Sequence, residues 1–251
     1  MTSTVTALSD VSPVTQTSLA DAIKAAWVST LGYTAIDDYT VSTTRNLVFQ
    51  KSLGLGKTYD NVYFQISVTS GLVVSQTLHT GWNASTHVGT NSGSTGIGIT
   101  FVNTSPVSMK TFRNNSGEFD FLVVYQNLTS HILGWVRPAT LNNVDENFYC
   151  AFLEFGAFQN PPTLRSVGSS ASLLGTTVWD VLTCNIPLTN HYNKNDIIPR
   201  LIVYGNAKSV LGITSDDIAF GAGNGLGLFA TVGDWIKVYN GGSTYSSIFL
   251  K

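Results

Sequence analysis

Short runs of β-branched and aromatic residues, separated by turn sequences, constrain the fold of this chain most strongly. Partial alternation of apolar and polar residues in several runs is typical of strands with one buried face. Turn sequences rich in Asn, Gly and Pro lie between them, and no fixed-period repeat occurs. The pattern predicts a mostly β protein, a sandwich or a partly open barrel. The runs cover residues 47–49, 61–68, 119–125, 132–136, 149–155, 198–204, 227–230 and 234–239.

One segment near the N-terminus has helical periodicity instead. Ser18 with Asp21 three residues later resembles a capping box, and Gly32 suits the residue that ends a helix. We therefore predict one amphipathic helix over residues 19–31, whose apolar stripe packs on the β core. The alternative is that this stripe binds a partner. The stripe consists of Leu19, Ala22, Ile23, Ala26 and Trp27.

The chain divides into three parts by composition. Residues 1–17 are rich in Ser and Thr and carry one charge, so we expect an extended N-terminal arm that is either disordered or ordered only against a neighbour. Residues 18–207 would form the main β domain together with the helix. Residues 208–251 are a possible small C-terminal β subdomain. A second possible boundary lies in the Pro-, Ser- and Gly-rich residues 160–177.

The polar surface depends on uncharged residues. Charged residues make up 11% of the chain, against about 25% in an ordinary globular domain. Because few charges would need to be buried at a contact, such a surface suits a subunit packed into an assembly. A secreted β protein with a neutral surface is the alternative. The net charge of −2 and the scattered Lys and Arg residues indicate no nucleic-acid partner.

The N-terminus and the hydropathy pattern bear on localisation. Residues 1–10 lack the basic start and the apolar run of a secretion signal. No stretch approaches the ~20 apolar residues of a membrane-spanning helix. We therefore expect synthesis in a cytoplasm and no membrane partner. The two cysteines, Cys150 and Cys184, have no metal-ligand or redox spacing, and we expect them to be buried thiols.

Two glycine-rich segments resemble nucleotide-binding motifs incompletely. Residues 51–58 (KSLGLGKT) end like a phosphate-binding loop, but Lys51 stands where the first glycine is required. Residues 221–227 lack the surrounding βαβ unit of a dinucleotide site. We expect turns at both places. Since a Gly-x-Ser-x-Gly elbow is also absent, no catalytic residue and no cofactor is predicted.

The four histidines show no zinc-ligand spacing, so no metal site is predicted. His79 and His87 flank Trp82 in an expected loop and could line a small polar pocket. These three residues and Trp27 are the candidate interface or ligand-binding residues of the chain.

Two segments resemble virion proteins of tailed bacteriophages. In residues 119–156, FDFLVVYQNLTSHILGWVRPATL is followed by NFYCAFLEFG, similar to a strand pair that precedes a Tyr-rich stretch ending in Gly. Residues 211–240 (LGITSDDIAFGAGNGLGLFATVGDWIKVYN) are similar to the C-terminal segment of those proteins. The resemblance implies a non-catalytic virion component of the tail, neck or baseplate.

The leading hypothesis is therefore a structural subunit of a phage particle, found in the virion and made in the host cytoplasm. Its expected partners are other virion proteins, with assembly as a homo-oligomer or ring. The second hypothesis is a carbohydrate- or receptor-binding module of a fibre or lectin type, with a host glycan as partner. Tryptophans would supply rings that stack on sugars there. An enzyme is the third.

Overall fold

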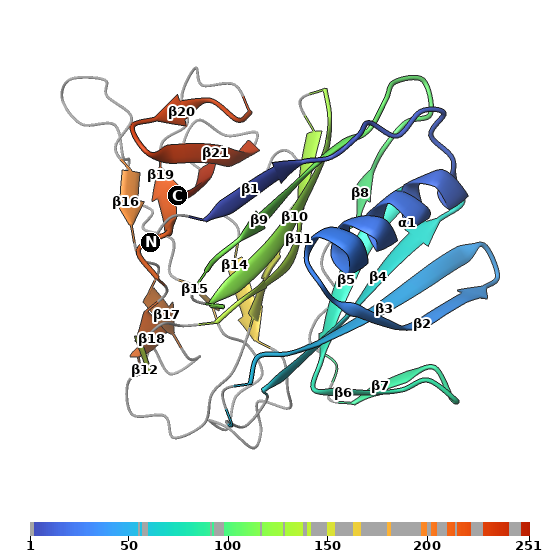
Figure 1. The fold of residues 1–251 in the computed structure, drawn as a ribbon, viewed down its shortest axis with the longest axis horizontal. Helices are drawn as coiled ribbons and strands as arrows, with labels where there is room; N and C mark the ends of the chain where they lie inside the picture. Colours follow the sequence, from blue (N-terminus) through green and yellow to red (C-terminus); the bar gives the residue numbers. More distant parts are fainter. Residues whose placement is uncertain are drawn as a thin grey trace.

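Antiparallel pairing organises the chain. The structure, a computed structural model, describes residues 3–54, 56, 60–90, 92, 98–115, 117–127, 129–137, 140–141, 150–153, 163–166, 180–181, 197–199, 202–204, 210–213, 215–221, 228–240 and 247–251. Within these residues the strands form four larger sheets and one two-stranded hairpin. Figure 1 shows the first sheet in blue and cyan, the second mainly in green, and the C-terminal strands in orange and red.

The first sheet has the strand order β2-β3-β4-β5-β8. Along β4 every second side chain is buried, and these side chains form the inner face. Residues 51–58, which resemble a phosphate-binding loop, begin at the end of β3, and β3 pairs antiparallel with β4. Residues 55, 57 and 58 of this segment lie outside the described residues, so the turn predicted there stays a prediction. The strands are β2 (Thr34–Val41), β3 (Thr44–Ser52), β4 (Asn61–Thr69), β5 (Val73–His79) and β8 (Ile99–Thr100).

The hairpin of β6 (Gly81–Asn83) and β7 (Val88–Thr90) follows β5 in sequence. Figure 1 shows it beside β2 and β3, on the other side of these strands from the helix.

The second sheet has the order β1-β9-β10-β11-β13-β14. Its central strands β10 and β11 are buried along nearly their whole length, because both faces of the sheet are covered there. The strands are β1 (Thr4–Ala7), β9 (Ser108–Arg113), β10 (Phe119–Gln126), β11 (Thr129–Val136), β13 (Cys150–Leu153) and β14 (Thr163–Ser166).

The helix begins earlier than the sequence indicated. Helix α1 (Gln16–Ala25) is capped by Thr15, whose side chain accepts a hydrogen bond from the backbone N–H of Ser18. The Ser18 hydroxyl in turn accepts from the backbone N–H of Thr15. Ser18 thus occupies the third helical position, and its assignment as the cap was wrong because the reciprocal pair is Thr15 and Ser18.

The helix continues as a π-helical turn, η1 (Ala26–Thr30), and then stops. Gly32 follows with φ +70°, so its predicted role at the end of the helix is confirmed.

The main core lies where α1, η1 and the first two sheets meet. The helix packs on β3 and β4, which Figure 1 shows beneath it. Trp27 is fully buried among the rings of Tyr33, Phe49 and Phe64. The second sheet contributes Val107, Met109, Leu122, Val124, Leu133 and Trp135 to the same core.

The segment expected as an extended arm, residues 1–17, follows the edge of the second sheet where the structure describes it. β1 pairs with β9, and Val11 forms an isolated bridge with Val107. Val14 is buried in the core just before the helix begins. The N-terminal segment therefore packs against its own chain.

The C-terminal strands form two further sheets, with the orders β12-β18-β17-β15 and β16-β19-β22-β21-β20. Residue 208, the expected start of a C-terminal subdomain, lies outside the described residues. Strands from before and after it pair with one another, β17 with β18 and β16 with β19. The strands are β12 (Thr140–Leu141), β15 (Asp180–Val181), β16 (Ile197–Pro199), β17 (Ile202–Tyr204), β18 (Val210–Ile213), β19 (Ile218–Gly221), β20 (Thr231–Val232), β21 (Trp235–Asn240) and β22 (Ser247–Leu250).

The predicted fold class is confirmed: the protein is mostly β, with antiparallel sheets and a helix near the N-terminus. None of the sheets closes into a barrel in the described residues. Neither described helical segment is long and apolar enough to cross a membrane. The strand predicted over residues 227–230 was wrong, because Leu228 and Phe229 form a turn, with Phe229 at φ +63°. The run at residues 198–204 is not one strand, because it contributes to β16 and β17, which belong to different sheets.

Candidate functional site

The outer face of the first sheet carries polar and aromatic side chains. Since Phe64 and Ile66 of β4 point into the core, the alternate residues Tyr63, Gln65 and Ser67 face outward. Asp37 of β2 lies opposite Val48 of β3, and Val48 lies opposite Gln65 of β4. Asp37 is therefore on the same face as Gln65. Tyr39, two residues after Asp37, therefore also lies on this outer face.

The β6–β7 hairpin covers part of this face. Its turn is held by Asn83, whose side-chain oxygen accepts from the backbone N–H groups of Ser85 and Thr86, at 3.0 and 3.3 Å. His87 ends the turn with φ +55°, a left-handed conformation that directs the chain into β7. The hairpin thereby brings Trp82 and His87 to β2.

Asp37 is the polar centre of the site. Its Oδ2 accepts from Trp82 Nε1 at 2.9 Å and from His87 Nδ1 at 2.8 Å. A carboxylate in this position only accepts, so Nδ1 of His87 carries the proton. The Asp37 side chain is 9% exposed, whereas that of His87 is 46% exposed. One nearly buried carboxylate therefore orients two rings of the hairpin.

The rings around Asp37 form a continuous group. His87 stacks on Tyr39 with ring centroids 4.1 Å apart and an interplanar angle of 18°. Trp82 lies 6.3 Å from Tyr39, tilted by 34°. The rings of His79 and Trp82 lie at an interplanar angle of 60°, with their centroids 5.1 Å apart. We call Asp37, Tyr39, His79, Trp82 and His87 the hairpin site.

His79 is the buried member of the hairpin site. Its Nδ1 lies 3.0 Å from Ser92 Oγ, and its side chain fits against the backbone of Gly89, where a Cβ atom would come within 2.0 Å of Nδ1. Burial lowers the pKa of His79 to about 4, so its ring is neutral at neutral pH. A neutral buried ring holds the hairpin on the sheet.

Amide and hydroxyl groups support the site from the sheet. The Asn46 side-chain oxygen accepts from Gln65 Nε2 and from the Ser67 hydroxyl, both at 2.7 Å. Gln65 also donates to the Tyr39 hydroxyl at 3.4 Å. Burial and the nearby Asp37 charge raise the pKa of Tyr39, so its hydroxyl keeps its proton.

Three of the four candidate residues named from the sequence thus lie together, His79, Trp82 and His87. Trp27 lies in the core on the other face of the sheet. Sequence reasoning missed Asp37 and Tyr39, since the hairpin and β2 are some fifty residues apart. Their spacing of two in β2, which puts them on one face of a strand, was the available signal.

A second polar cluster lies inside the protein and is structural. Asp120 binds Lys51 Nζ at 2.7 Å and Arg113 Nε at 3.3 Å, and it accepts from the Tyr33 hydroxyl at 2.9 Å. The Tyr33 hydroxyl also accepts from Trp135 Nε1. Burial, and then the Asp120 charge, raise the pKa of Tyr33 well above its ordinary value. This cluster ties the first sheet to the second.

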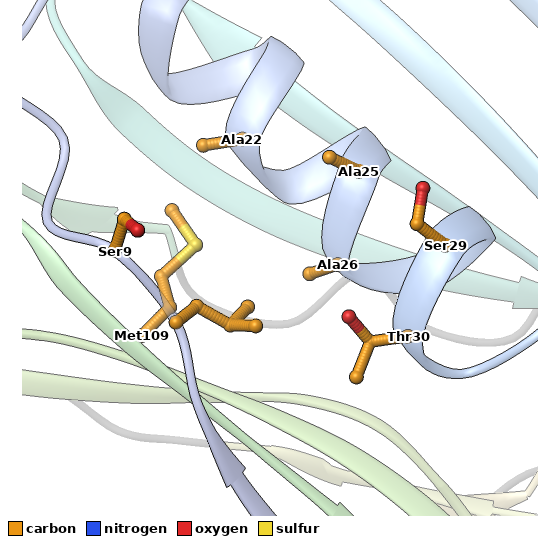
Figure 2. Close-up of a pocket in the computed structure, with 8 residues that line it drawn as sticks. Ser9, Ala22, Ala25, Ala26, Ser29, Thr30 and Met109 are labelled. Atoms are coloured by element: carbon orange, nitrogen blue, oxygen red, sulfur yellow. The ribbon is translucent and has the colours of Figure 1, made fainter.

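An apolar cavity of 260 Å³ lies between the helix and the N-terminal segment, beside Met109 of β9 (Figure 2). Hydroxyls of Ser9, Ser29 and Thr30 are its polar groups, and it has no ionisable side chain. The other lining residues are Leu8, Ala22, Ala25 and Ala26. Across the residues that the structure describes, no group of three or more His, Cys, Asp or Glu side chains could hold a metal ion.

Comparison of the chain with models of protein families finds no family that matches it, and comparison with curated proteins finds no match. The hairpin site and the surface of the chain are therefore the basis for a functional assignment.

Proposed function

We propose that this chain is a non-catalytic structural component of a tailed-phage particle, in the tail, neck or baseplate, that acts through contacts with other subunits. The observation that carries the proposal is the use of its carboxylates as cross-links. Asp120 joins β10 to β3 and β9, Asp38 joins β2 to Lys24 of the helix, and Asp37 joins β2 to the hairpin. Engagement of these three carboxylates in cross-links between elements supports a structural role for them.

The surface composition supports an assembly role. With charged residues at 11%, the exposed polarity comes mainly from Ser, Thr, Asn and Gly. These groups lose less solvation free energy than charges do when a partner covers them. The two segments similar to tailed-phage virion proteins, residues 119–156 and 211–240, favour a phage particle as the assembly.

The test is to locate the chain in purified particles. Lysates that contain it would be fractionated on a density gradient, and each fraction analysed by quantitative mass spectrometry and by cryo-EM. We expect the chain at a fixed copy number per particle, with the symmetry of a ring or tail. A chain that stays in the soluble fraction, away from intact particles, would contradict the proposal.

The non-catalytic part is tested separately. The purified chain, incubated with host cell-wall polysaccharide, should release no reducing ends above a blank. Release that rises in proportion to the amount of chain would contradict this part.

A further inference from the structure

We infer that the hairpin site binds a neutral saccharide, with a sugar ring stacked on the aromatic rings of Trp82 and His87. This inference goes beyond a role in subunit contacts and does not depend on it. It rests on the ring arrangement, on the unused acceptor atoms of the site and on the local charge.

The rings of Trp82 and His87 present apolar faces next to one another on the hairpin site. Trp82 is half-buried and the His87 side chain is 46% exposed, so both rings reach solvent from an anchored position. Tyr39 stacks nearly parallel on His87, and His79 packs against the Trp82 ring. Preorganised rings lose little conformational entropy on binding, and their faces suit the apolar C–H face of a pyranose.

The polar atoms left at the site are acceptors. Both donors that reach Asp37 bind its Oδ2, and no donor in the described part of the chain binds its Oδ1. In the His87 tautomer that donates to Asp37 from Nδ1, Nε2 is the acceptor. A ligand rich in hydroxyl donors complements Oδ1 of Asp37 and Nε2 of His87. Saccharide hydroxyls have this chemistry.

The local charge selects a neutral sugar. Asp37 gives the site a negative charge. The cations next to β2, Lys24 and Arg45, bind Asp38, which faces the helix on the opposite side of the sheet. An acidic sugar would meet the Asp37 carboxylate without a Lys or Arg side chain bound to it among the described residues. The site therefore disfavours sialic and uronic acids.

The test is saturation-transfer difference NMR with the full chain and soluble saccharides at millimolar concentration. Maltohexaose, chitohexaose and mannopentaose are the neutral probes, and sialyllactose and oligogalacturonate are the acidic ones. We expect at least one neutral probe to bind and neither acidic probe to do so. Binding by none of the neutral probes overturns the inference, and so does a preference for the acidic ones.

Variants then locate the bound probe. Trp82→Ala and His87→Asn each remove one ring, and Asn tolerates the left-handed backbone of residue 87. Each should weaken binding by roughly tenfold or more. Val88→Ala is the matched control, because this neighbour on β7 is 57% exposed and lies outside the hairpin site. It should bind like the wild type.

Thermal unfolding of each variant identifies any that loses its fold. If Trp82→Ala unfolds, His87→Asn and Trp82→Leu, which removes the ring but keeps a large apolar side chain, carry the test. Wild-type affinity in all folded variants at positions 82 and 87 would place the saccharide elsewhere and overturn the inference.

Discussion

Gln76 and Gly134 join the two main sheets through a pair of hydrogen bonds. The Gln76 carboxamide on β5 donates to the Gly134 carbonyl and accepts from the Gly134 N–H on β11, each at 2.7 Å. Glycine is required at position 134, because φ is +133° and a Cβ atom would come within 2.1 Å of the Asp120 carbonyl oxygen. A single buried side chain thus satisfies backbone groups of the opposite sheet.

Replacing Gln76 should therefore destabilise the protein strongly. Gln76→Leu keeps a similar volume but leaves the N–H and the carbonyl of Gly134 without these partners. We expect a loss of about 2–4 kcal/mol in the free energy of unfolding, measured by urea denaturation. Ser75→Ala, on the other face of β5, should change it by less than about 0.5 kcal/mol. Equal stability of the two variants would contradict a role for Gln76 in joining the sheets.

The buried and the exposed carboxylate clusters should differ in their contribution to stability. Asp120, whose side chain is 3% exposed, binds Lys51 and Arg113. Asp120→Asn weakens the charged hydrogen bonds to these two partly exposed cations, and we expect a loss of about 2–3 kcal/mol.

Asp38→Asn is the matched control. The Asp38 side chain is 25% exposed and binds Arg45 and Lys24 at the surface. We expect a loss of about 1 kcal/mol or less for this variant. Urea denaturation of both variants at neutral pH measures the contrast, and a larger loss for Asp38→Asn would contradict it.

Much of the fold followed from local patterns. The runs at residues 61–68, 119–125 and 132–136 became β4, β10 and β11, because dense β-branched and aromatic residues suit a buried sheet. β2 was not predicted. It contains adjacent aspartates and a register shift between Ala35 and Asp37, and Asp38 is compensated by Arg45 across the strand pair. Such compensation depends on register, which the local sequence does not specify.

The hairpin site was only partly predictable, because one part of it is local in sequence and the other depends on strand register. His79, Trp82 and His87 lie within nine residues, so a short loop was sufficient to suggest that they meet. Asp37 and Tyr39 join them only through the pairing of β2, β3, β4 and β5 and the placement of the hairpin across that sheet. The contact with the carboxylate is therefore a tertiary feature.

Stability should fall as the pH is lowered from about 6.5 to 4, because of His79. Burial lowers its pKa from 6.5 to about 4 in the folded protein. Within this window the unfolded chain binds a proton that the folded protein does not, so acid favours unfolding. The stabilisation present above pH 6.5 is lost as the pH approaches 4, and amounts to up to about 3 kcal/mol.

Urea denaturation at a series of pH values measures this effect. His79→Asn should lack this part of the pH dependence. The free energy of unfolding of the wild type should therefore fall relative to that of the variant as the pH is lowered from 6.5 to 4, and the difference should be constant outside this window. The stabilisation from Asp38, whose pKa is lowered to about 2 by its hydrogen bond with Arg45, is lost at lower pH, below 3.8. Parallel profiles of wild type and His79→Asn would show that His79 titrates normally in the folded protein.

Variants of Trp27 test whether the apolar stripe of the helix packs in the core or binds a partner. Its ring is 0% exposed and makes edge contacts with Tyr33 at 4.8 Å and Phe64 at 4.5 Å, so it packs within its own chain. Trp27→Ala should cost about 3–5 kcal/mol and lower the melting temperature of the isolated protein. Trp27→Phe should cost less, because it keeps a ring and Trp27 Nε1 has no hydrogen-bond acceptor among the described residues.

Val28→Ala, at a neighbouring side chain that is 37% exposed, is the control and should melt near wild type. If Trp27→Ala also melted near wild type and failed only to enter particles, the apolar stripe of the helix would act on a neighbouring subunit instead of the core.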